Sequence, residues 1–297
     1  MIATICRELN FPDEAVLSLS SDFEKMVAVP GAVQKLMVAM DDLFLAEGEN
    51  YAAVVKEVAE QAGVHPYAAD MVFALWCAHS LRYVYKQKGW SEELFWDAMA
   101  DLRYKLKECI DIKGVWGSFV ASWFRGFFIG DRHALGRLQY EPRELKYPYG
   151  EYWEGELVYN CHIPSSGPLT PELVLDSLKK AYDFYKPKDG ILKVVCSTWM
   201  LYPPMYEVYP AGSNLRAFYE LFTVLHYKES PENKNLWRIF GSETDLKKLP
   251  ENSNLQRRLK AYLLEGNTMG SGYGILLFDG EKVLNKPCFF DKNGVKY

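Results

Sequence analysis

Two polar side chains, Asn160 and His162, interrupt a largely apolar segment near the middle of the chain. Residues 157–163 alternate with a period of two, which predicts a β-strand with Val158, Asn160 and His162 on one face. A strand inside a sheet that helices cover is expected to be apolar on both faces, so this polar pair indicates a cavity. A neutral imidazole there accepts a proton near pH 7 and suits a general base. The alternative is a histidine that bonds only a neighbouring backbone carbonyl.

A second polar row precedes this strand. Residues 135–141 also alternate, and Arg137, Gln139 and Glu141 share one face. If the two strands are neighbours, Glu141 approaches His162, and a carboxylate beside an imidazole favours its charged form and makes it a stronger base. The alternative is an exposed row at a sheet edge.

The strand of residues 157–163 leads into a loop of small residues and then into a helix. Ser165, Ser166 and Gly167 follow Ile163-Pro164, and Thr170-Pro171 supplies an N-cap and a first helical residue. The backbone N–H groups of such a loop face outward at the positive end of a helix, which suits phosphate or pyrophosphate. The spacing matches neither GxxxxGK[ST] nor GxGxxG. The alternative is an ordinary strand-to-helix turn.

Residues 191–199 predict another apolar strand, and its last residues are Ser197, Thr198 and Trp199. Their position at a strand end makes these three candidate substrate contacts. No GxSxG elbow surrounds Ser197, which argues against a serine hydrolase. Cys161 and Cys196 are expected to be small buried apolar residues rather than nucleophiles.

The elements that must position these residues differ between the two halves of the chain. Apolar residues at helical spacing, with Gly63 and Gly89 as stops and Ser91 as an N-cap, predict an all-helical domain over residues 1–128. An aromatic-rich helix over 116–128 is expected to pack at the domain interface. The helices are expected over residues 33–40, 51–62, 66–88 and 91–106.

The second half interleaves strands with single helices, which predicts a mixed sheet flanked by helices over residues 129–297. The whole chain is therefore expected to have an α+β fold. Helices are expected over 171–185, after Ser213-Asn214, and over 253–264. Strands are expected over 135–141, 157–163, 191–199, 221–227, 236–240 and 273–278.

The composition is that of a globular protein, and it excludes several classes of partner. The 297 residues carry 34 Lys and Arg against 39 Asp and Glu, a net charge of -5 without a basic stripe, so no nucleic-acid partner is expected. No apolar run is long enough to cross a membrane, and no signal peptide begins the chain. The six cysteines, Cys288 among them, form no CxxC pair and are expected to be reduced, in the cytoplasm. No metal site is expected.

The motifs described above resemble the strand, pyrophosphate loop and helix of the GNAT (GCN5-related N-acetyltransferase) fold. More closely, 135–141 together with 162–169 is similar to a family of bacterial acyltransferases that joins a helical N-terminal domain to a GNAT-like C-terminal domain. The strand that ends at Tyr202-Pro203 and the Ser213-Asn214 pair also suit that family. The resemblance covers the whole chain.

The resemblance implies roles for residues of this sequence. It implies an acyl-CoA site, with acetyl-CoA as the expected donor, at Ile163, Ser165, Ser166, Gly167, Leu169, Thr170 and Asn214. Many GNAT enzymes have a tyrosine seven residues after the asparagine that starts the fourth helix, where it protonates the leaving thiolate. Here that position is Leu221, and Tyr219 is the nearest tyrosine. His162, Glu141 and Tyr219 are therefore the expected catalytic residues, and Asn160, Ser197, Thr198 and Trp199 the substrate contacts.

The function that follows from the resemblance is an acyl-CoA-dependent N-acyltransferase. The acceptor is expected to be an amine of a small molecule or a peptide, with no metal involved. The alternative is a non-catalytic GNAT-derived module that binds a ligand or a partner in an aromatic cleft between its domains. The sequence leaves the oligomeric state undecided.

Overall fold

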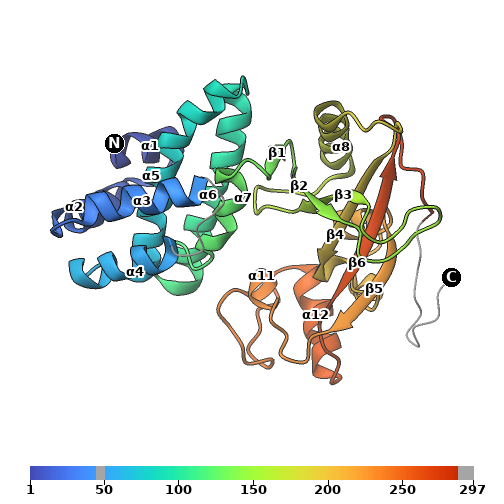
Figure 1. The fold of residues 1–297 in the computed structure, drawn as a ribbon. Coiled ribbons are helices and arrows are strands. Elements are labelled where there is room, and N and C mark those ends of the chain that lie inside the picture. The colour runs from blue at the N-terminus through green and yellow to red at the C-terminus, as the bar shows by residue number, and fades with distance from the viewer. Residues whose placement is uncertain (45–50, 287–297) are drawn as a thin grey trace. The chain divides into compact units, whose positions relative to one another are not determined.

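The computed structural model describes residues 1–44 and 51–286. Contacts divide the chain into a helical unit, residues 1–134, and a sheet-containing unit, residues 135–297. Figure 1 shows the two units, in blue to green and in green to red. The division falls six residues after the predicted boundary.

The first unit consists of helices followed by one short strand. Its elements are α1 (Ile2–Glu8), α2 (Asp13–Ala28), α3 (Ala32–Phe44), α4 (Tyr51–Ala62), α5 (Pro66–Gln87), α6 (Glu92–Lys113), the 3₁₀-helix η1 (Ala121–Phe124), α7 (Arg125–Phe128) and β1 (His133–Leu135), whose last residue belongs to the second unit. No strand precedes β1 within the described residues. Capping residues determine the ends of these helices, as α6 shows. At its start the Ser91 hydroxyl accepts a hydrogen bond from the Leu94 N–H at 3.1 Å, and at its end Gly114 adopts a φ of 69°.

The predicted helix over 116–128 is only partly correct. Residues 121–128 are helical, but the backbone before them extends to bond α5, where Ser118 N–H donates to the Tyr67 carbonyl at 2.9 Å. A Cβ at Gly117 would overlap the Tyr67 backbone, so this close approach requires glycine. Phe124, Phe127 and Phe128 lie in the apolar core of the helical unit.

A six-stranded mixed sheet forms the centre of the second unit (Figure 1). Its order is β1-β2-β3-β4-β6-β5. β2 and β3 are antiparallel, β3 and β4 are parallel, and β6 is antiparallel to both β4 and β5. The strands after β1 are β2 (Leu138–Glu144), β3 (Leu157–His162), β4 (Leu192–Thr198), β5 (Thr223–Glu229) and β6 (Gly270–Phe278). The predicted strand 135–141 is interrupted at Gly136, whose φ of 74° separates β1 from β2.

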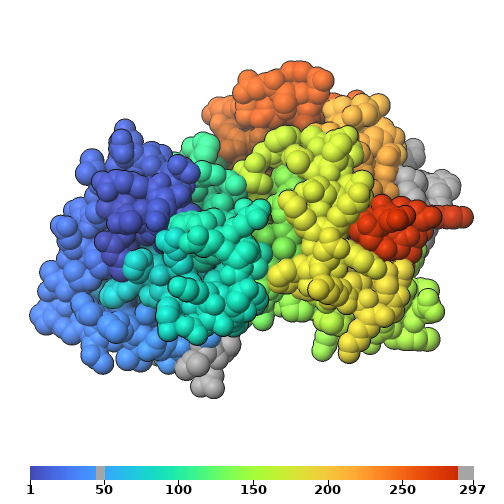
Figure 2. Space-filling view, turned by 90° about the horizontal axis from the view of Figure 1, so that it is seen from above, coloured from blue at the N-terminus to red at the C-terminus, as the bar shows by residue number. Residues whose placement is uncertain are grey.

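Helices of this unit follow the strands singly. They are α8 (Pro171–Tyr185), the 3₁₀-helix η2 (Trp199–Leu201), α9 (Met205–Val208), α10 (Asn214–Tyr219), α11 (Trp237–Phe240) and α12 (Asn254–Leu264). α8 packs on β2 and β4, and Figure 2 shows it in yellow on the surface of the molecule. The η2 backbone lies directly on β6 because Gly272 has no side chain to hold it off.

The predicted strand over 236–240 is wrong. The segment forms α11, because Leu236 and Phe240 are one helical turn apart and both are buried, and the Phe240 N–H donates to the Leu236 carbonyl at 2.9 Å. The prediction of an α+β fold with a helical first domain and a flanked mixed sheet is confirmed.

Candidate active site

The polar face predicted for β3 meets the polar row of β2. In the antiparallel register, Glu141 is opposite Asn160 and Gln139 is opposite His162. Glu141 Oε1 lies 2.9 Å from His162 Nε2, and Asn160 Nδ2 lies 3.0 Å from the same Nε2. The Asn160 amide also donates to Glu141 Oε1 at 3.4 Å. The predicted approach of Glu141 to His162 is therefore present, with Asn160 beside both.

The Glu141 carboxylate orients the imidazole ring of His162. The Glu141 side chain is only 4% exposed and that of His162 is 18% exposed. A carboxylate held this close fixes the position of a side chain of the type that can accept a proton at neutral pH.

Arg143 is a member of this cluster that the sequence analysis did not name. Its guanidinium lies 2.8 Å from Glu141 Oε1, the same oxygen that faces His162, while half of its own side chain is exposed. The cation offsets part of the buried negative charge next to His162. Arg143 continues the alternation of Arg137, Gln139 and Glu141 by one step, so extending that row by two residues would have found it.

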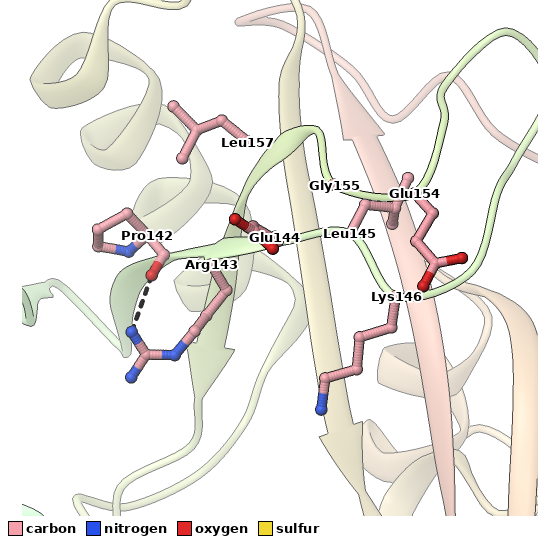
Figure 3. A pocket seen from close by; sticks show the side chains of 8 residues that line it. All are labelled: Pro142, Arg143, Glu144, Leu145, Lys146, Glu154, Gly155 and Leu157. Carbon is pink, nitrogen blue, oxygen red and sulfur yellow. Dashed lines mark hydrogen bonds between the residues drawn. The ribbon is translucent and has the colours of Figure 1, made fainter.

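Arg143 also connects the cluster to a surface hollow. Figure 3 shows this hollow of about 780 Å³, where the Arg143 and Lys146 side chains extend toward the same side and Arg143 donates to the Pro142 carbonyl at 2.9 Å. The other lining residues are Glu144, Leu145, Glu154, Gly155 and Leu157.

His162 lies at the end of the sheet where β3 and β4 stop pairing. The parallel register joins Tyr159 to Val194 and Asn160 to Val195, whereas β4 continues to Thr198 paired with β6 alone. The backbone groups at the C-terminal ends of β3 and β4 are consequently not hydrogen-bonded to each other. A ligand with an extended chain can use such a point of separation.

The residues at the end of β4 have mixed surroundings. Ser197 is exposed, Trp199 is buried, and the Thr198 hydroxyl accepts the Met200 N–H at 3.3 Å as the N-cap of η2. The Cys161 thiol is hydrogen-bonded to that of Cys196, and this bond together with burial raises the pKa of Cys161 well above its usual range. A protonated, buried thiol is a poor nucleophile, as the sequence predicts for Cys161.

The loop between β3 and α8 is exposed over Ser165, Ser166, Gly167 and Pro168. Among the described residues, no protein acceptor receives the backbone N–H of Ser166 or Gly167. Gly167 has φ 125° with open space where a Cβ would lie, so the backbone conformation rather than crowding requires glycine. These two amides are available to an anion.

The start of α8 contributes less to an anion site than the sequence predicts. Pro171 has no N–H, and Leu173 donates its N–H to the Thr170 hydroxyl at 3.4 Å. The Glu172 carboxylate bonds its own backbone N–H and the Thr170 hydroxyl, and these bonds lower its pKa. The helix end is therefore satisfied internally, and the loop supplies the free donors.

The remaining predicted residues have different surroundings from one another. Asn214 is exposed at the start of α10, where Ser213 is the N-cap. Leu169 is buried against a narrow apolar slot of about 50 Å³ between α8 and α10, which Ala217 and Phe218 also line. Ile163 is half-buried. Tyr219 is fully buried, and the structure does not bring it to the surface near His162.

Within the described ranges, no group of three or more His, Cys, Asp or Glu side chains is placed to hold a metal ion. Five cysteines of these ranges are free thiols; Cys288 lies outside them. No helix over residues 1–44 or 51–286 combines the length and apolarity needed to span a bilayer.

Comparison with known proteins matches each half of the chain to a domain family. The N-acyltransferase N-terminal domain matches residues 1–130, and the GNAT-like C-terminal domain matches residues 133–276. No curated protein sequence matches the chain.

Several solved structures share the fold. An acyltransferase in complex with decanoyl-CoA is 20% identical with a TM-score of 0.66, over 93% of this chain and 99% of its own. An acyltransferase complex with decanoyl-CoA and teicoplanin has the same identity and coverage and a TM-score of 0.62. A mutant acyltransferase with octanoyl-CoA, also 20% identical, has a TM-score of 0.61 over 92% of this chain and 99% of its own.

Proposed function

This chain belongs to the proteins that join an N-acyltransferase N-terminal domain to a GNAT-like C-terminal domain, and we propose that it is an acyl-CoA-dependent N-acyltransferase. The observation that carries the proposal is the Glu141–His162 pair at 2.9 Å, located where β3 and β4 separate. An orienting carboxylate, a titratable imidazole and a nearby exposed loop together suit a base next to a thioester.

In the proposed reaction a neutral amine attacks the thioester carbonyl. The new bond is C–N, the bond that breaks is C–S, and the His162 imidazole takes the proton that the attacking nitrogen loses. Glu141 stabilises the imidazolium that results. A backbone N–H at the C-terminal end of β3 stabilises the oxyanion, and holding both substrates in place supplies much of the acceleration.

The leaving group needs little acid catalysis. A thiol with a pKa of about 8.5 leaves as a thiolate without prior protonation. The burial of Tyr219 is thus compatible with turnover, and the proposed mechanism assigns it no proton transfer.

The proposed donor is an acyl-CoA held by the loop after β3 through the N–H groups of Ser166 and Gly167. Acetyl-CoA, the donor predicted from the sequence, has no support among the structural neighbours, which hold decanoyl-CoA or octanoyl-CoA. The proposal is therefore for acyl-CoA as a class. The acceptor is an amine of a small molecule or a peptide, which a neighbour that holds teicoplanin beside decanoyl-CoA supports.

One observation favours the alternative, a non-catalytic module that binds acyl-CoA or another ligand. The hydroxyl of Tyr219, the residue predicted as the general acid, is fully buried. Such a module would bind acyl-CoA without consuming it.

Titration calorimetry with acetyl-, octanoyl- and decanoyl-CoA and with free CoA tests the first part of the proposal. Release of free CoA thiol across a panel of small amines and peptides, in wild type and His162→Ala, tests the second. Binding of acyl-CoA with His162-dependent thiol release supports the enzyme. Binding without release by any amine supports the module, and no binding of any CoA contradicts both.

A further inference from the structure

Arg137, just before β2, binds the loop between β3 and α8 from behind. Its Nη1 donates to the Pro164 carbonyl, its Nη2 to the Gly167 carbonyl and its Nε to the Pro168 carbonyl, each at 2.9 Å. The side chain is nearly buried, at 9% exposure, whereas Gly167 and Pro168, two of the three loop residues it holds, are exposed. Three directed bonds from one planar group define the path of the whole loop.

These bonds also decide where two of the loop amides point. In a trans peptide the N–H points opposite to the C=O of the same unit, and the structure has no cis peptide bond among its described residues. With the Pro164 and Pro168 carbonyls facing Arg137, the N–H groups of Ser165 and Leu169 are directed away from it. The N–H groups of Ser166 and Gly167 lie between these two fixed units.

Arg137 further supplies charge that the loop itself lacks. Residues 163–170 contain no lysine or arginine, and the first charged residue after them is Glu172, an acid. An arginine side chain remains protonated at any physiological pH, and burial beneath the loop limits its screening by water. A positive charge behind the loop and amides in front of it both favour an anion on the exposed side.

We propose that Arg137 is the positioning residue that makes the loop of residues 164–168 a receptor for the phosphate groups of acyl-CoA. This inference rests on the proposed function. Arg137 touches no part of the ligand and acts through the peptide units that it holds. It takes the place of the further glycines that phosphate loops commonly use, since this loop has a single glycine and two prolines.

The test compares decanoyl-CoA with a ligand that has the same thioester and no phosphate. Calorimetry on the full chain measures the binding of decanoyl-CoA and of S-decanoyl-pantetheine, which lacks both the phosphate groups and the adenosine of CoA. Arg137→Gln is expected to weaken decanoyl-CoA binding by about 10- to 100-fold, the range for hydrogen bonds to charged groups, and pantetheine thioester binding by less than about twofold. Arg137→Lys keeps the positive charge but cannot make the three directed hydrogen bonds of the guanidinium, so an intermediate loss of decanoyl-CoA affinity is expected.

Arg258→Gln is the matched control. Arg258 also donates to two backbone carbonyls, those of Val208 at 2.6 Å and Glu207 at 2.5 Å, but on α9 instead of the loop. The Arg258→Gln variant is expected to weaken the binding of both ligands by the same factor, or to leave both affinities unchanged. Thermal melts identify a variant that fails to fold, in which case Arg137→Lys decides the question.

Equal loss for both ligands in the Arg137 variants, or undiminished decanoyl-CoA binding, overturns the inference while the proposed function stands. If wild type binds decanoyl-CoA no better than the pantetheine thioester, the loop is not a phosphate receptor and the inference fails. If wild type binds neither, the proposed function fails with it.

Discussion

Two buried acid–base pairs, one in each unit, have similar chemistry and different surroundings. On α6, Lys105 Nζ lies 3.0 Å from both carboxylate oxygens of Glu108, with side chains 8% and 10% exposed. In the sheet, one oxygen of Glu141 lies near both His162 and Arg143. The first pair is formed by neighbours on one helix. The second joins two strands at the point where the sheet separates, and one of its members is an imidazole, the side chain that proteins most often use to give and take protons. Proton transfer therefore needs both a titratable partner and a place for a substrate.

The largest expected effect is the loss of acyl-transfer rate on substitution of His162. His162→Ala is expected to lower the acyl-transfer rate by about 100- to 10,000-fold, the usual contribution of a positioned base. Its effect on the free energy of unfolding is expected to be small, because the ring is at the edge of the core. Steady-state kinetics and urea unfolding of the same preparation measure both. A near-normal turnover removes His162 from the mechanism.

For the Lys105–Glu108 pair we expect a loss of stability without a loss of activity. Lys105→Ala leaves the Glu108 carboxylate buried without its ammonium, which is expected to lower the free energy of unfolding by about 3 kcal/mol. The turnover per folded molecule is expected to be unchanged. The double variant Lys105→Met, Glu108→Leu is the control, since it removes both charges and is expected to recover most of the stability. A loss of turnover at full stability would show that this pair also serves the reaction.

Glu141→Gln tests whether Glu141 orients His162, and its expected effect is smaller than that of His162→Ala. The amide keeps the size of the side chain but removes the charge that stabilises the imidazolium, so kcat is expected to fall by about 10- to 100-fold, as for loss of a charged hydrogen bond. The KM for acyl-CoA is expected to change little. A change in KM alone would instead assign Glu141 to binding.

A half-buried carboxyl of the helical unit is expected to affect stability alone. Burial raises the pKa of Asp70 to about 6, above the 3.8 of an exposed carboxyl. The folded state then binds more protons than the unfolded state between about pH 4 and 6, so stability rises as the pH falls through this window. Asp70→Asn is expected to stabilise the protein at pH 8 by about 3 kcal/mol, with a much smaller effect at pH 4. Urea unfolding at both pH values checks this, and equal effects at the two would contradict it.

The smallest effect is expected at Arg143. The guanidinium near Glu141 disfavours a second positive charge on His162, so Arg143→Gln is expected to move the acid limb of the pH–rate profile to higher pH by less than about one unit. The side chain is half exposed, and solvent screening keeps the shift small. The rate well above neutral pH is expected to match wild type. Arg143→Lys, which keeps a cation, is the control and is expected to restore the profile.

Local patterns predicted much of the fold correctly. The helix of residues 171–185 and its cap at Thr170 were correct because caps and periodicity involve residues within one or two turns. The segment 236–240 was misassigned because four apolar residues in five fit either a buried strand or a short helix. The extended backbone before η1 was missed because it depends on a contact between Gly117 and Tyr67, fifty positions apart.

The candidate site was predictable in part for the same reason. Period two alone placed Asn160 and His162 on one face, and Glu141 on a face of its own strand. The fixed position of Arg137 beneath the loop carries no sequence signal, since its partners are backbone carbonyls that any residue provides. Likewise, helical spacing after Asn214 does not reveal that the Tyr219 ring turns into the core.

By itself, the sequence determined the longer helices α3–α6, α8 and α12 and which side chains share a strand face, because these properties arise from interactions between near neighbours. The tertiary structure decided that β2 pairs with β3 in the register that sets Glu141 opposite Asn160. It also decided that β4 leaves β3 after Val195, and that Arg137 reaches carbonyls 27 to 31 residues away. Shifting that register by one residue would turn Glu141 away from His162, and only the packing of the whole sheet fixes it.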